Sequence, residues 1–65
     1  MKRSEALNLI YRDIYQDTAS FGESPDICAY TANQCRDFYS NCSNSVLAGV
    51  VEDHTGVRPA INGGR

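Results

Sequence analysis

The chain has 65 residues and a formal net charge of −2, with six basic and eight acidic side chains spread along it. A chain of this length holds one domain at most and buries only about 60% of its extended surface, which excludes a large interior. Its basic residues never cluster beyond the pair Lys2-Arg3, so the concentrated positive face that phosphate binding requires is missing.

The chain carries neither an export signal nor an apolar segment approaching the roughly 20 residues of a membrane span. We therefore expect a cytoplasmic protein that has no membrane partner. Small domains often need a disulfide, a metal or a second copy for stability, so a homodimer is also a possible state.

The first predicted element is an amphipathic helix over residues 4–20. At 100° per residue its apolar positions share an arc of about 140°. They are Leu7, Ile10, Tyr11, Ile14, Tyr15, Thr18 and Phe21. Ser4 is the predicted N-cap, and Gly22 is the predicted stop.

A second helix is predicted over residues 24–42, because Ser24-Pro25-Asp26 combines a hydroxyl cap, a proline at the first helical position and an acid in the first turn. Its apolar arc also spans about 140°. The arc contains Ile27, Cys28, Thr31, Ala32, Cys35, Phe38, Tyr39 and Cys42. Two such helices with a short connection predict an antiparallel hairpin.

Residues 46–55 favour a short third helix that ends at Gly56, although their β-branched composition leaves a strand or a continuation of the second helix as alternatives. The expected fold is all-α: a helical hairpin plus a short third helix packed across it, forming a three-helix mini-bundle. Residues 1–56 would form this single domain, and residues 57–65 a flexible C-terminal tail. The predicted interior comprises Leu7, Ile10, Ile14, Phe21, Ile27, Cys28, Cys35, Phe38, Val46 and Val50.

Cys28, Cys35 and Cys42 follow one another at seven-residue intervals. Seven residues of helix rise about 10.5 Å, too far for a disulfide or for shared zinc ligation within one helix. We expect free thiols that fill space in the core. A redox-responsive subunit interface, or a metal site built with His54, is the alternative reading. No catalytic, metal-binding or cofactor-binding residue is predicted, and no cofactor.

Two exposed apolar residues on otherwise polar helix faces are the best candidates for contact with a partner. Tyr30 lies beside Gln34 and Asp37, and Leu9 lies beside Asp13. The predicted partner-binding residues are these five, with Glu23, Asp26 and Asp37 as an acidic rim.

The stretch Asp26-Ile27-Cys28, with Phe38-Tyr39 and Cys42 downstream, resembles the second helix of the Rop family of RNA-binding plasmid-copy-number proteins. Rop proteins are homodimers of helical hairpins, so the resemblance implies that a hairpin of this length can dimerise. It extends to no functional residue, because a basic RNA-facing surface has no counterpart here.

The expected function is that of a non-enzymatic protein-binding module, an inhibitor or adaptor that occupies the surface of a larger protein or complex. In size and charge the chain is similar to phage or mobile-element inhibitors of host defence, anti-CRISPR proteins among them. One alternative is a dimeric nucleic-acid-associated regulator acting through Lys2, Arg3, Arg12 and Arg36, although nucleic acid is not the favoured ligand. The other alternative is a metal-binding or redox protein that uses its cysteine thiols or its histidine.

Overall fold

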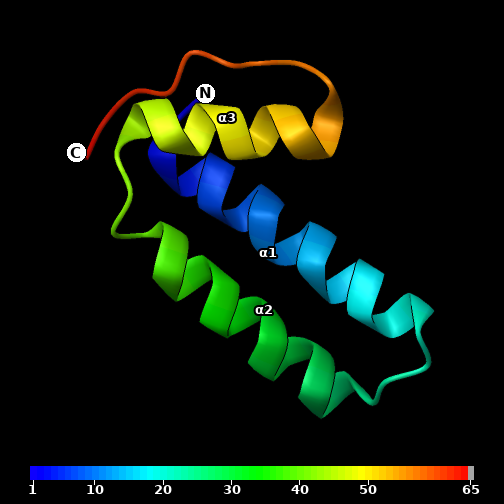
Figure 1. The fold of residues 1–65 in the computed structure, drawn as a ribbon. Helices are drawn as coiled ribbons and strands as arrows, with labels where there is room; N and C mark the ends of the chain where they lie inside the picture. The colour runs from blue at the N-terminus through cyan, green and yellow to red at the C-terminus, as the bar shows by residue number, and fades with distance from the viewer. Residues whose placement is uncertain (65) are drawn as a thin grey trace.

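The computed structural model describes residues 1–64 and folds them into helices α1 (Arg3–Ser20), α2 (Pro25–Tyr39) and α3 (Asn44–Thr55). The only strand-like pairing in this range is an isolated bridge between Lys2 and Asn62. The prediction of an all-α fold with a helical hairpin and a third helix is confirmed (Figure 1). Among residues 1–64, no helix combines the length and the apolarity needed to cross a bilayer.

Several helix ends lie where the sequence predicts them. Ser24 Oγ accepts a hydrogen bond from the Ile27 N–H at 3.4 Å and so caps α2. α3 begins at Asn44, before the predicted start at residue 46, and Ser43 Oγ caps it by accepting a hydrogen bond from the Val46 N–H at 3.3 Å. Gly56, at the end of α3, has a φ of 81°, a conformation that glycine adopts without the steric cost of a Cβ.

Two further predicted helix ends are wrong. Ser4 is not the N-cap of α1, because the helix begins at Arg3, whose N–H donates to the carbonyl of Asn62 at 2.9 Å. This contact satisfies a donor that would otherwise need a side-chain cap. α2 ends at Tyr39 rather than at Cys42. The reason is that Ser40 Oγ donates back to the carbonyl of Asp37, an alternative to continued helix.

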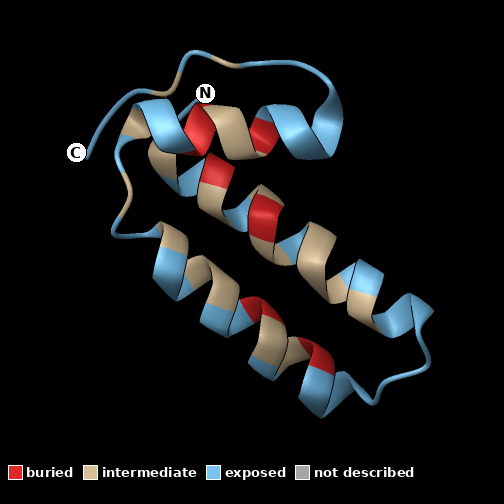
Figure 2. Ribbon diagram, in the orientation of Figure 1, coloured by how far each residue is buried: buried red, intermediate tan, exposed pale blue. Residues whose placement is uncertain are grey.

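α1 is the central helix, and α2 and α3 both pack against it (Figure 1). The buried core is built mostly from small and aliphatic side chains along these two contacts (Figure 2). It comprises Ala6, Ile10, Cys28, Ala32, Leu47, Ala48 and Val51. Three of these residues are alanines, which allow the helix backbones to approach closely.

Much of the predicted interior is less buried than expected. Ile10 and Cys28 are buried as predicted, while four predicted core residues are half-buried: Leu7, Ile14, Cys35 and Val50. Four others are exposed, and for these the prediction is wrong: Phe21, Ile27, Phe38 and Val46. Ile27 and Phe38 are exposed because α2 has one main neighbour, α1, and a single helix covers only part of an apolar arc about 140° wide. Phe21 lies past the last residue of α1, and Val46 lies on the side of α3 away from its buried residues Leu47, Ala48 and Val51.

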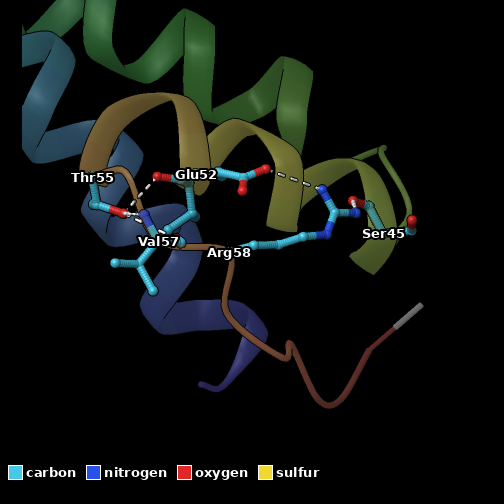
Figure 3. A network of polar contacts seen from close by, with 6 residues as sticks. Ser45, Glu52, Thr55, Val57 and Arg58 are labelled. Carbon is cyan, nitrogen blue, oxygen red and sulfur yellow. Dashed lines mark hydrogen bonds and ion pairs between the residues drawn. The ribbon is translucent and has the colours of Figure 1, made fainter.

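Residues 57–64 run back from the end of α3 to the N-terminus. The Arg58 guanidinium donates to the carbonyl of Ser45 at 3.0 Å and lies 3.6 Å from the Glu52 carboxylate (Figure 3). Farther along, the Asn62 N–H donates to the Met1 carbonyl at 2.9 Å. These contacts attach the segment to the bundle, and its predicted flexibility in solution stays a prediction.

Candidate functional site

A row of mainly apolar, exposed side chains runs along α2. Ile27, Tyr30, Gln34 and Phe38 recur at helical spacing, so they share one face. Ile27 is 47% exposed, Tyr30 is 66% exposed and Phe38 is 68% exposed. From Ile27 to Phe38 the row rises about 16 Å, or three turns of helix. We call these four residues the α2 stripe.

The packing of α2 explains why the stripe is uncovered. Cys28 and Ala32 are the buried residues of α2, and they define the side that packs on α1. At 100° per residue, the centre of the stripe lies about 130° around the helix from this side. α3 does not cover the stripe, because it packs against α1 instead.

One edge of the stripe is acidic. Asp26 and Asp37 are both exposed and lie on the same flank of the stripe by helical spacing. The exposed Glu23 lies just before α2 begins. The opposite flank carries the uncharged side chains of Thr31 and Cys35.

The one basic residue of α2 is turned away from the stripe and engaged elsewhere. The Arg36 guanidinium lies 4.7 Å from the centre of the Tyr11 ring, a cation–π contact with α1. It also donates to Asn33 Oδ1 at 2.8 Å. The charge beside the stripe is therefore negative and is not balanced by Arg36.

The five predicted partner-binding residues separate into two groups. Tyr30, Gln34 and Asp37 are exposed on α2, at or beside the stripe. Leu9 and Asp13 belong to α1 and are half-buried. Leu9 lines a different, shallow depression together with Met1, Glu5, Asn8 and Arg12.

Asp13 has a specific partner on α3. Its Oδ2 lies 2.6 Å from Nδ1 of His54, and the two side chains are 39% and 27% exposed. The sequence places Glu52 and Asp53 beside His54, but the histidine pairs across the bundle with α1. The His54–Asp13 pair thus links α3 to α1.

The pair lines a depression of about 420 Å³, together with Ile14, Gln16, Asp17 and Ser20. A histidine oriented by a carboxylate can act as a general base toward a hydroxyl group or a bound water. The Ser20 hydroxyl instead donates to the carbonyl of Asp17 at 2.5 Å, a bond within its own helix. The contacts observed in this depression are the His54–Asp13 pair between α3 and α1 and the Ser20 hydrogen bond within α1.

All three cysteines are free, as predicted. Cys28 is buried, and Cys35 and Cys42 are half-buried. Among residues 1–64, no group of three histidine, cysteine or acidic side chains is placed to hold a metal ion.

Sequence reasoning missed Ile27 and Phe38 as surface residues, since it assigned both to the core. A signal was present in the width of the apolar arc of α2, which exceeds what one neighbouring helix covers. Their spacing to Tyr30 then places all three residues along one exposed row.

A scan of protein-family models finds none that matches the chain, and searches of curated proteins and of solved structures return no match either.

Proposed function

We propose that this protein is a small protein-binding module that uses the α2 stripe to occupy the surface of a larger protein or complex. The observation that carries the proposal is the exposure of Ile27, Tyr30 and Phe38 in one row on a single helix face. Scattered exposed apolar residues are ordinary, but exposed apolar residues gathered on one helix face and rimmed by polar residues are typical of an interaction site.

The composition of the stripe also favours protein contact. Aromatic side chains contribute large contact areas and are enriched among residues that dominate binding energy. Tyr30 adds a hydroxyl at the edge of such an area, and Gln34 adds an amide that can donate and accept hydrogen bonds. The specific example that we favour is an inhibitor from a phage or mobile element, which would block host machinery by covering a working surface.

The contacts of the basic residues favour this function over nucleic-acid binding. The Arg3 guanidinium donates to Asn44 Oδ1 and to the carbonyls of Ser40 and Cys42, at 2.8, 2.7 and 2.6 Å. Arg36 is engaged with Tyr11. Two of the four residues named for the nucleic-acid alternative therefore already hold internal partners.

Affinity capture with matched variants tests the proposal. Tagged wild-type protein, Tyr30→Ser, Phe38→Ser and Val57→Ser are incubated with lysate of the native host, and bound proteins are identified by mass spectrometry. Val57 is the control, because it is as exposed as Phe38, at 68%, but lies beyond α3. We expect one partner to be captured by wild type and Val57→Ser and lost from both stripe variants.

Equal capture by all four proteins would overturn the assignment to the α2 stripe. Recovery of nucleic acid, lost steeply as salt is raised, would favour the regulator alternative instead. Far-ultraviolet circular dichroism on each variant establishes that it is folded.

A further inference from the structure

We propose that the α2 stripe receives a basic amphipathic helix of the partner protein. This inference rests on the proposed function and names the chemistry of what binds there. It follows from the shape of the stripe, the charge beside it and the pairing geometry of two copies of the chain.

The shape of the stripe fits a helix. In the body of α2 the backbone N–H and C=O groups are bonded within the helix, so a partner contacts side chains and cannot add a strand. Ile27, Tyr30, Gln34 and Phe38 form a nearly straight row over three turns. A second helix laid along this row presents side chains at the matching i, i+3, i+4 and i+7 spacing.

The charge beside the stripe selects a basic partner. Asp26 and Asp37 lie at the two ends of one flank, and Glu23 lies beyond the first of them. Lysine or arginine side chains on the partner helix would meet these carboxylates at the rim, where complementary charge sets orientation and association rate. Acidic side chains at the same positions would be repelled.

The same charges disfavour a second copy of this chain as the occupant. Asp26 directly precedes the stripe and Asp37 directly precedes its last residue, so the two acids lie near opposite ends of the row. In an antiparallel pair of copies, Asp26 of each copy would lie near Asp37 of the other. In a parallel pair, the acidic flank of each copy would face the uncharged Thr31 and Cys35 flank of the other. The antiparallel arrangement therefore places like charges together, and the parallel arrangement gives the carboxylates no basic partner.

Designed peptides test the inference directly, with binding followed by fluorescence anisotropy. The first probe is a fluorescein-labelled helix of about 18 residues, five turns, with leucine along one face and lysine on its flanks. The second replaces each lysine with glutamate. The third has the composition of the first in scrambled order, which removes the apolar face.

We expect the leucine–lysine peptide to bind at least tenfold more tightly than either other peptide. Asp26→Asn with Asp37→Asn should weaken its binding by about three- to tenfold and reduce its salt dependence. Phe38→Ser should abolish binding, whereas Val57→Ser should leave it unchanged.

The outcomes separate this inference from the proposed function. Equal binding of the lysine and glutamate peptides, with both lost in Phe38→Ser, would overturn the basic partner and leave the stripe as a binding site. Lysine-peptide binding that survives Phe38→Ser would show that the stripe is not used, which counts against both proposals. Sedimentation that shows a dimer of the wild-type protein, lost in Phe38→Ser, would identify a second copy as the occupant and overturn the basic helix.

Discussion

Replacing Phe38 with alanine distinguishes a surface stripe from an extended core. Because Phe38 is 68% exposed, only about a third of its surface is covered. Full burial of a phenylalanine side chain contributes about 1.5–3 kcal/mol, so its partial burial here contributes less than about 1 kcal/mol. Its ring also contacts the Tyr39 ring edge-on, with centroids 5.2 Å apart, an arrangement that adds about 0.5–1.5 kcal/mol.

We therefore expect Phe38→Ala to lower the free energy of unfolding by about 1–2 kcal/mol. Ile10→Ala is the matched core substitution, because Ile10 is fully buried between the helices. It should cost about 2–5 kcal/mol, which approaches the whole stability of a domain this small. The ratio of the two effects is the diagnostic quantity.

Urea unfolding followed by circular dichroism at 222 nm measures both variants. The free energy of unfolding should fall by only about 1 kcal/mol per molar urea, because a short chain exposes little surface on unfolding. A loss in Phe38→Ala as large as that in Ile10→Ala would refute the reasoning. It would mean that the ring of Phe38 is buried in solution, either within the bundle or between copies of the chain.

Four further substitutions are tested by the same urea unfolding. Asp13→Asn and His54→Gln, combined in a double-mutant cycle, should show a coupling of about 0.2–1 kcal/mol, and no coupling would contradict the pair. Arg3→Ala removes three hydrogen bonds and should lower the free energy of unfolding by about 2–3 kcal/mol. An unchanged free energy would show that these hydrogen bonds do not stabilise the fold. Gly49→Ala should raise the free energy of unfolding by up to about 1 kcal/mol, because alanine has the higher helix propensity. The new Cβ would lie 3.4 Å from the flexible end of the Arg58 side chain, which can move aside. A clear loss of stability would show that this side chain cannot move.

The local structure of the chain was largely predictable because its signals are local. Ser24 and Ser43 cap helices through their own hydroxyls, and Gly56 ends one by adopting a positive φ. Such preferences depend on a few neighbouring residues and need no knowledge of the rest of the fold. The three helices, their approximate ends and the free thiols follow from this local information.

The covered faces were decided by tertiary packing alone. The apolar arc of α2 contains both Cys28 and Phe38, and its periodicity does not say which part a neighbour covers. Ala6 and Ala48 are buried because close helix contact requires small side chains. The sequence pattern did not identify either residue as part of the core. The docking of α3 on α1 brings Asp13 to His54 and leaves one face of α2 open. The candidate site is this open face, and it arises from how three helices share one core.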